Sequence, residues 1–137
     1  MKKKALIVIL TCILSAEIIF IVSTAVGGKK PFKNLEPSEI VSATVRLTPP
    51  DTTIRITKIR ELTEYLNDVI IYHEDNSYTE YCGQGVIFTL ILSDGTQKKI
   101  MAYNPFLVID GVGYRTKYEP CQALNAYANK LLYDVKQ

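Results

Sequence analysis

The chain of 137 residues is poor in the side chains on which most catalytic and metal sites depend. It has one histidine, His73, three cysteines and no tryptophan. Zinc sites and hydrolytic triads usually combine histidine with further ligands or a nucleophile, and no partner stands at metal-binding spacing from His73. We therefore predict no catalytic residues, no metal and no cofactor, and we expect a protein that is not an enzyme.

The part of the sequence expected to fold also lacks an excess of charge. From Lys29 onward there are thirteen basic and thirteen acidic side chains, so the net charge of +2 comes from the N-terminus. Nucleic-acid binding depends on clustered Lys and Arg that neutralise phosphates. The even balance argues against a nucleic-acid partner.

One long apolar run is present, over residues 5–26, and Lys2, Lys3 and Lys4 precede it. As a helix it would extend about 33 Å, enough for a hydrocarbon core of about 30 Å. Lysines before such a span favour keeping that end in the cytoplasm. The pattern predicts a single-pass transmembrane helix that contacts the membrane through residues 5–26 and holds the following domain outside the cytoplasm.

Glu17 falls inside this span, where an acid is penalised by a few kcal/mol on insertion scales. We interpret it as a membrane-embedded acid that is protonated or paired with a partner helix. Two other interpretations of the segment stay open. Small residues at Ser23 and Ala25 suit signal-peptide cleavage after Ala25, which would give a secreted domain, and Cys12 could be the acylated residue of a lipoprotein. All three place the domain outside the cytoplasm.

The sequence thus divides into two parts. Residues 1–30 form the anchor or signal peptide with a short linker, and residues 31–137 form one extracytoplasmic domain. The linker, Gly27-Gly28-Lys29-Lys30-Pro31, is expected to be short and flexible.

Within the domain, strand and helix patterns alternate. Apolar residues at every second position predict strands over 41–48, 52–57, 70–73, 86–93, 97–109 with a bend or bulge at Pro105, and 112–116. Helical spacing predicts two amphipathic helices, one N-capped by Thr57 and one with Pro120 in its first turn. The order β-β-α-β-β-β-β-α predicts an α+β fold, with an antiparallel sheet of about five to six strands and both helices on one face.

This order of elements resembles the TATA-binding-protein-like and β-lactamase-inhibitor-like folds, in which a curved antiparallel sheet carries helices on one face. Such a likeness concerns the fold and does not dictate function. The stretch Asn104-Pro-Phe-Leu-Val-Ile-Asp-Gly-Val-Gly-Tyr114, with Tyr118-Glu-Pro-Cys121, resembles an uncharacterised family of small exported or membrane-anchored proteins of Gram-positive bacteria. The resemblance covers roughly residues 32–133 and implies a bacterial surface location; no catalytic residues carry over.

Tyrosines give the positive indication of a binding surface. Five are candidates: Tyr72, Tyr78, Tyr81, Tyr103 and Tyr114. The first three fall in or beside a long polar loop predicted over residues 75–85, and the others fall on later strands. Tyrosine combines a large contact area with a hydrogen-bonding tip, and it is enriched at interfaces. The alternative is a tyrosine-rich core and rim around one sheet.

Cys82 and Cys121 could form a disulfide, because export permits one. It would close a loop of about forty residues and contribute roughly 3–4 kcal/mol in the chain-entropy model. The alternative is that Cys121 fills the buried face of the last helix while Cys82 is a small loop residue. Cys121 also lies in the first turn of that helix, where a lowered pKa could make it a nucleophile with His73 as base.

Together these features predict a non-catalytic interaction or sensory module, tethered to the cell membrane, whose partner is a membrane or surface protein. The alternative is a domain that binds a small molecule or a cell-wall fragment in an apolar pocket between sheet and helices. A thiol or carboxylate enzyme is a distant third.

Overall fold

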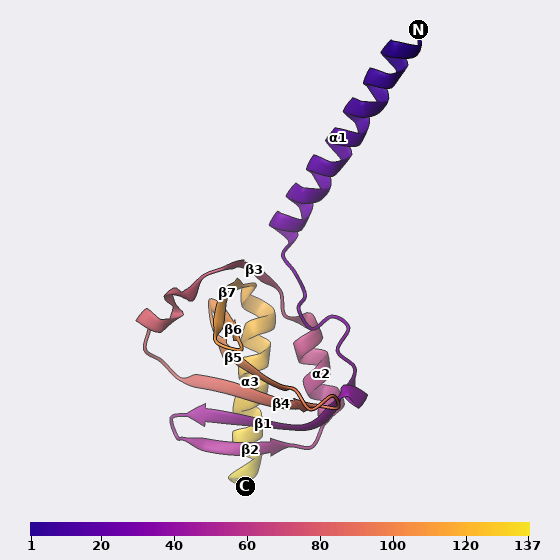
Figure 1. Ribbon diagram of the computed structural model, residues 1–137. Coiled ribbons are helices and arrows are strands. Elements are labelled where there is room, and N and C mark those ends of the chain that lie inside the picture. Colours follow the sequence, from indigo (N-terminus) through magenta and orange to yellow (C-terminus); the bar gives the residue numbers. More distant parts are fainter.

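The computed structural model describes the backbone of residues 1–137 and the side chains of residues 1–19 and 26–137. An N-terminal helix, α1 (Lys2–Gly27), projects from an α+β domain, and the two chain ends lie at opposite ends of the molecule (Figure 1). The domain contains η1 (Pro37–Glu39), β1 (Ile40–Thr48), β2 (Thr52–Ile56), α2 (Ile59–Asp68), β3 (Ile71–Glu74), η2 (Asn76–Glu80), β4 (Gly85–Leu92), β5 (Gln97–Tyr103), β6 (Phe106–Ile109), β7 (Val112–Thr116) and α3 (Tyr118–Val135). The elements η1 and η2 are short 3₁₀ helices.

The strands form one antiparallel sheet in the order β2-β1-β4-β5-β6-β7-β3. The predicted α+β class and antiparallel pairing are confirmed, but the predicted strand number is wrong, because the sheet has seven strands. The difference lies at Asn104-Pro105, where we expected one bent strand over 97–109. Instead the chain reverses, and Tyr103 of β5 pairs with Phe106 of β6. Proline has no N–H for a ladder, so a two-residue turn is a more favourable place for Pro105 than a strand interior.

The alternation of apolar residues directs one face of the sheet into the core. Val45 pairs with Phe88, and Phe88 pairs with Ile100, so the three side chains lie side by side on that face. All three are fully buried. Strand β4 is an interior strand of the sheet, since it lies between β1 and β5.

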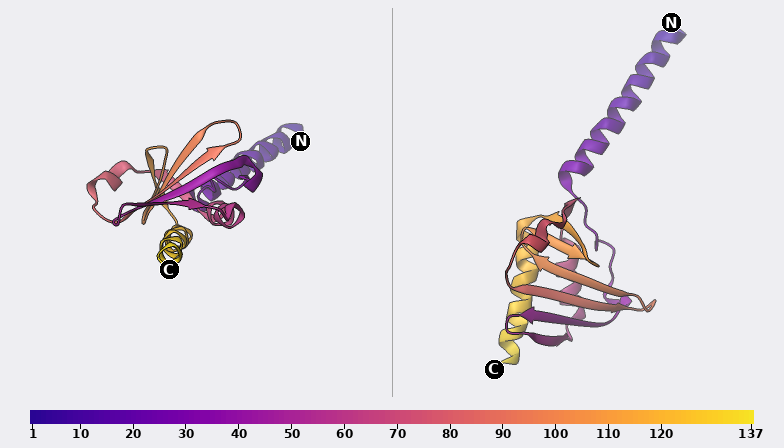
Figure 2. Two further views of the ribbon diagram at one scale, coloured as in Figure 1. Left: turned by 90° about the horizontal axis from the view of Figure 1, so that it is seen from below. Right: turned by 60° about the vertical axis from the view of Figure 1, so that its left-hand side comes forward.

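Helices α2 and α3 lie together against this face (Figure 2). The ring of Tyr127 on α3 stacks on Tyr65 of α2 at 4.8 Å and on Phe88 of the sheet at 6.5 Å, and so joins the two layers. The N-cap predicted at Thr57 is wrong: α2 begins at Ile59 after Lys58, with no side-chain cap. The carbonyl of Thr57 instead accepts a hydrogen bond from the Ile59 N–H in a tight turn.

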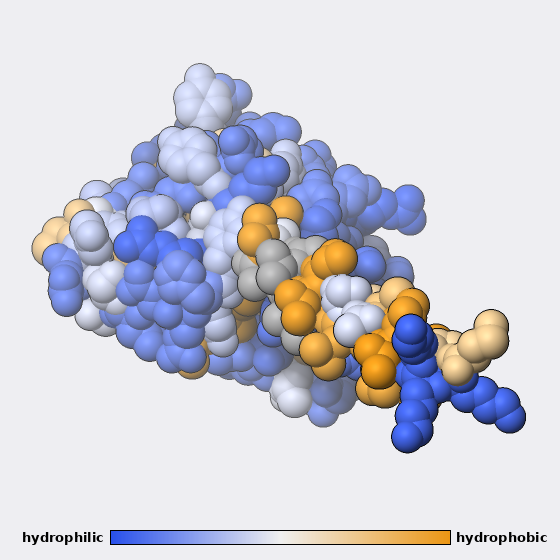
Figure 3. All heavy atoms as spheres, turned by 90° about the horizontal axis from the view of Figure 1, so that it is seen from above, coloured by the Kyte–Doolittle hydropathy of each residue, from blue (hydrophilic) through white to orange (hydrophobic). Residues whose placement is uncertain are grey.

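The apolar residues of helix α1 are not confined to one of its faces, and Figure 3 shows apolar side chains along the side of the helix that is seen from above. Its large apolar side chains are each more than half exposed: Leu6, Ile7, Val8, Ile9, Leu10, Ile13, Leu14, Ile18, Ile19 and Val26. Over the residues whose side chains are described, which leave out 20–25 of this helix, no helix is long and apolar enough to cross a membrane. The expected helix is thus present, and its crossing of a membrane stays a prediction.

The segment after α1 is not the flexible linker that its glycines led us to expect. Lys29 and Ile71 of β3 exchange two backbone hydrogen bonds, at 2.7 and 2.8 Å. Gly28 has a φ of 72°, and a Cβ there would lie 2.6 Å from Cγ2 of Ile70. Asn67 at the end of α2 donates to the carbonyl oxygens of Phe32 and Leu35. Residues 28–36, here called the lead-in, are therefore held against the domain by close packing at Gly28 and by hydrogen bonds from Lys29 onward.

Candidate interaction surface

Three of the five candidate tyrosines gather on the face of the sheet opposite α2 and α3. Tyr78 and Tyr81 come from the segment between β3 and β4, and Tyr103 comes from β5, two residues after Met101. These four side chains, here called the outer tyrosine surface, line a shallow hollow of about 240 Å³. The buried Ala102 between Met101 and Tyr103 faces the core, as the alternation of a strand requires.

The segment that carries Tyr78 and Tyr81 is fixed at its start by Asp75. The Asp75 carboxylate accepts from the N–H of Ser77 at 2.9 Å and caps η2, while its own N–H donates to the Gly113 carbonyl of β7 at 2.8 Å. The Nε of Arg115 donates to the other carboxylate oxygen at 2.7 Å. Hydrogen bonds from Ser77, and then from Arg115, lower the pKa of Asp75 to about 2.

Phe106 forms the buried base of this surface. The rings of Tyr78 and Tyr81 are tilted over it, with centroid distances of 6.4 and 5.6 Å. The guanidinium of Arg115 lies 4.5 Å from the centre of the same ring, within cation–π range. One fully buried phenylalanine thus supports the side chains of two tyrosines and one arginine.

Two glycines allow the aromatic rings to approach the backbone this closely. A Cβ on Gly113 would lie 2.5 Å from Cδ1 of Tyr78, and a Cβ on Gly83 would lie 2.7 Å from the hydroxyl of Tyr103. Real side chains do not tolerate such distances, so any larger residue would displace the rings. The hydroxyl of Tyr78 is also held, by donating to the Gly111 carbonyl at 3.1 Å.

The arrangement offers contact area and hydrogen-bonding tips, and no reaction chemistry. Tyr81 is 55% exposed, so its ring is available to a partner while its inner edge rests on Phe106. Rigid, half-exposed aromatic side chains lose little conformational entropy on binding. The surface thus presents ring faces and hydroxyl groups that a binding partner could contact.

The other two candidate tyrosines lie elsewhere, so the five do not form one surface. Tyr72 on β3 is 36% exposed, and its ring lies against Gly28 at the end of α1. Tyr114 on β7 lines a groove on the opposite face of the sheet. Neighbouring residues in a strand point to opposite faces, which is why Tyr114 and the Tyr78 contact at Gly113 are separated.

The remaining predicted site residues, which are two cysteines, a histidine and a glutamate, do not lie together in one site. Cys82 and Cys121 are free thiols, so the disulfide is not formed in this structure; Cys82 is exposed and Cys121 is buried. Burial raises the pKa of the Cys121 thiol to about 12, the opposite of the lowered pKa that a nucleophile at a helix start requires. His73 and Glu17 are exposed, on β3 and α1. Among the described side chains, no three His, Cys, Asp or Glu residues converge as metal ligands.

Sequence reasoning missed the residues that hold the surface in place. Arg115 and Asp75 were ordinary charged residues in the sequence, because their pairing depends on β7 lying beside β3. Gly113 carried a usable signal: an isolated glycine in a strand often marks a close approach of another group. Gly113 lies within the strand predicted over 112–116, which is β7, but we drew no close contact from it.

Comparison with protein-family models, with curated proteins and with solved structures finds no match to this chain. The resemblances drawn from the sequence therefore stay predictions, and the function rests on the geometry described above.

Proposed function

We propose that this protein is a non-catalytic interaction module, tethered to the cell membrane by α1 and held outside the cytoplasm, which binds a membrane or surface protein through the outer tyrosine surface. The observation that carries the proposal is the order of that surface. Tyr78 and Tyr81 are fixed over Phe106 by the Asp75–Arg115 pair, the capped η2 and the close packing at Gly113.

Support for the tether comes from the surface of α1. A helix that is apolar all round needs an apolar environment, either inside a protein or in a membrane. Helix α1 contacts the domain at β3, and the large apolar side chains described along α1 stay exposed. Lys2, Lys3 and Lys4 at its start are consistent with a cytoplasmic N-terminus.

A sensory role follows from the same connection. Only Gly28 separates the end of α1 from Lys29, which is paired with Ile71 in the sheet. The Asp75 N–H and carboxylate join the start of the tyrosine-bearing segment to β7, and β7 pairs with β3. A partner that displaces the segment carrying Tyr78 and Tyr81 would therefore act on β3. Strand β3 is hydrogen-bonded to Lys29, just after the end of α1.

The test is site-specific photo-crosslinking in cells that produce the full chain. The photoreactive amino acid p-benzoylphenylalanine would replace Tyr81, which is 55% exposed, and in a matched control it would replace Tyr133 of α3, which is 65% exposed. We expect one discrete crosslinked protein from position 81 and none from position 133. Equal or absent crosslinking at both positions would remove the outer tyrosine surface as the binding site.

Truncating the side chain of Tyr81 to alanine would measure how much it contributes to binding the partner. Interface tyrosines are frequent hot spots, and their removal commonly costs about 2 kcal/mol or more. We therefore expect Tyr81→Ala to weaken capture of the crosslinked protein by roughly tenfold or more, while Tyr133→Ala leaves it unchanged.

A further inference from the structure

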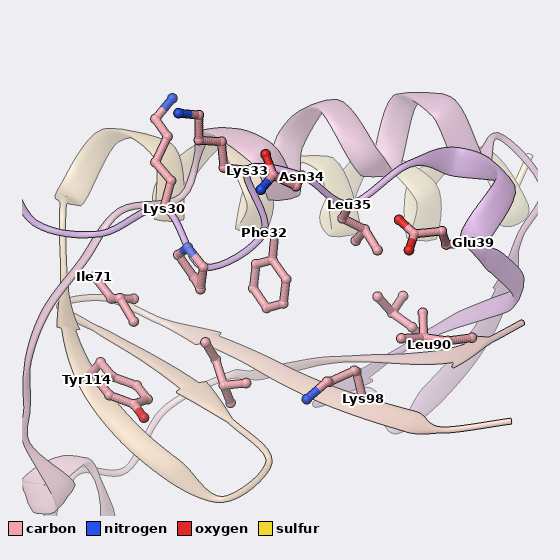
Figure 4. Close-up of a pocket in the computed structure, with 13 residues that line it drawn as sticks. Lys30, Phe32, Lys33, Asn34, Leu35, Glu39, Ile71, Leu90, Lys98 and Tyr114 are labelled. Atoms are coloured by element: carbon pink, nitrogen blue, oxygen red, sulfur yellow. The ribbon is translucent and has the colours of Figure 1, made fainter. Parts of the chain in front are cut away.

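A second candidate site lies on the other face of the sheet, under the lead-in. The lead-in crosses above the strands without filling the space beneath it, and a groove of about 470 Å³ remains (Figure 4). This volume falls within the range of about 300–1,000 Å³ that is usual for small-molecule sites. The groove is separate from the outer tyrosine surface, because the sheet lies between them.

Apolar side chains form both the roof and the floor of this groove. Phe32 and Leu35 point down from the lead-in toward Leu90 on the sheet (Figure 4). Leu92 of β4 and Ile109 of β6 also line the groove. A sugar or a cell-wall fragment would need hydrogen-bond partners for its hydroxyl groups once it left water. A lining of this kind instead favours an unbranched hydrocarbon chain.

Two charged side chains within the groove have partners on the protein. The ammonium of Lys98 lies 3.1 Å from a carboxylate oxygen of Asp110. A carboxylate oxygen of Glu39 accepts from the backbone N–H of Glu36 at 2.7 Å. The charge of Lys98 is thus balanced by Asp110, and Lys98 does not require an anionic group of a ligand.

Positive side chains are concentrated on the lead-in itself. Lys29, Lys30 and Lys33 follow the end of α1, and the lead-in has no acid before Glu36. Lys30 is paired with Asp68 at 3.3 Å, in a contact that is exposed to solvent. Lys30 and Lys33 are among the residues that line the groove, and Figure 4 shows their side chains extending from the roof, away from the space beneath it.

We infer that this groove binds one acyl chain of an amphiphile with an anionic head group, with the chain between Phe32 and the sheet and the head group at the lead-in lysines. The inference goes beyond the proposed protein partner and does not depend on it. Two sources share this chemistry, an anionic phospholipid of the membrane and a free fatty acid. A phospholipid source depends on the tether through α1, since Lys29 and Lys30 would then lie at the membrane surface.

The experiment is photolabelling of the full chain in phosphatidylcholine nanodiscs, with two arms. One arm contains phosphatidylglycerol and the other palmitic acid, each with a diazirine near the end of the acyl chain, and labelled peptides are identified by mass spectrometry. We expect labels in the segments that contain Phe32, Leu92 and Ile109. Labelling in one arm identifies the source, and labels confined to α1 in both arms overturn the inference.

Two variants with matched controls separate groove binding from general contact with lipid. Leu92→Trp fills the groove and should reduce its labelling to background, whereas Val41→Trp adds the same ring at an exposed position outside the groove. Lys33→Glu reverses one charge at the opening and should reduce labelling about two- to fivefold, whereas Lys136→Glu should not. Unchanged labelling in both groove variants overturns the inference. If the chain fails to remain with the nanodiscs, the tether is wrong, and the fatty-acid arm repeated in dilute detergent still tests the groove.

Discussion

The Nε atom of Arg115 donates a hydrogen bond to a carboxylate oxygen of Asp75 at 2.7 Å, and so joins β7 to the start of the segment that carries Tyr78 and Tyr81. The same guanidinium covers the ring of Phe106, on which both tyrosines rest. One side chain thus holds the segment by charge and supports its rings by stacking. The order of the outer tyrosine surface depends on this contact.

This contact predicts a loss of stability in acid. The pKa of Asp75 is lowered from 3.8 to about 2 by hydrogen bonds from Ser77 and Arg115, so the native state favours the ionised carboxylate. Its contribution is fully present above pH 3.8 and is lost as the pH falls toward 2. In Asp75→Asn, urea unfolding should show lower stability at pH 7 than the natural protein, and a shallower decline between pH 4 and pH 2.

Asp134→Asn is the matched control for that experiment, because it removes an exposed carboxylate on α3 that has no ion pair among the described side chains. It should follow the natural protein at every pH. A decline in Asp75→Asn as steep as that of the natural protein would show that the Asp75–Arg115 contact does not stabilise the fold.

Removing the polar group of Tyr127, unlike removing that of Asp75, is not expected to lower the stability of the fold. Its ring is stacked between Tyr65 and Phe88, and its buried hydroxyl has no hydrogen-bond partner in the described part of the chain. A buried polar group without a partner costs about 1–3 kcal/mol. We expect Tyr127→Phe to leave the free energy of unfolding unchanged or to raise it by about 1 kcal/mol, and Tyr127→Ala to lower it by about 3–5 kcal/mol. Urea unfolding measures both, and a destabilised Tyr127→Phe would reveal a partner for the hydroxyl.

Adjacent glycines at the end of α1 provide a paired test of the lead-in. A Cβ on Gly28 would lie 2.8 Å from the carbonyl oxygen of Ile71 and would require a φ of 72°, whereas a Cβ on Gly27 meets nothing within 4 Å. Gly28→Ala should destabilise the domain by more than about 1 kcal/mol and speed hydrogen exchange at the amides of Lys29 and Ile71. Gly27→Ala should do neither. Equal exchange in the two variants would mean that the lead-in is not paired with β3 in solution.

Much of the fold was predictable, because side-chain alternation depends on sequence alone. It located the strands to within about one or two residues wherever a single strand was present, as with Val45 and Phe88 in the core. It failed at Pro105, since a turn and a bulge share the same local signal. The N-cap predicted at Thr57 was wrong, because the Ile59 N–H donates to the backbone carbonyl of Thr57 in a tight turn and no side chain caps the helix.

The candidate site was less predictable, because its parts meet only through long-range pairing. Tyr103 and Tyr114 both lie on strands with similar patterns, yet one faces outward and the other lines the inner groove. The Lys29–Ile71 pairing crosses forty-two positions of sequence, and no local pattern announces it. The composition shows that tyrosine is abundant, but it does not show which tyrosines lie together on one surface.

The cysteines give a prediction that separates buried from accessible thiols. Cys82 is exposed, while burial raises the pKa of Cys121 to about 12 and removes its thiolate at neutral pH. In a purified Cys12→Ser background, a thiol reagent should modify one cysteine in the folded chain and both after unfolding in urea. Modification of neither cysteine before reduction would instead indicate the disulfide between Cys82 and Cys121.

The most direct measurement of the central claim, a domain held outside the cytoplasm at the membrane, uses the same thiol in living cells. Intact cells that produce the full-length Cys12→Ser chain would be treated with a membrane-impermeant maleimide, and then fractionated. We expect a full-length chain in the membrane fraction, labelled at Cys82 without lysis, with the label absent from Cys82→Ser. Labelling of Cys82 only after lysis would place the domain on the cytoplasmic side and would rule out the proposed topology.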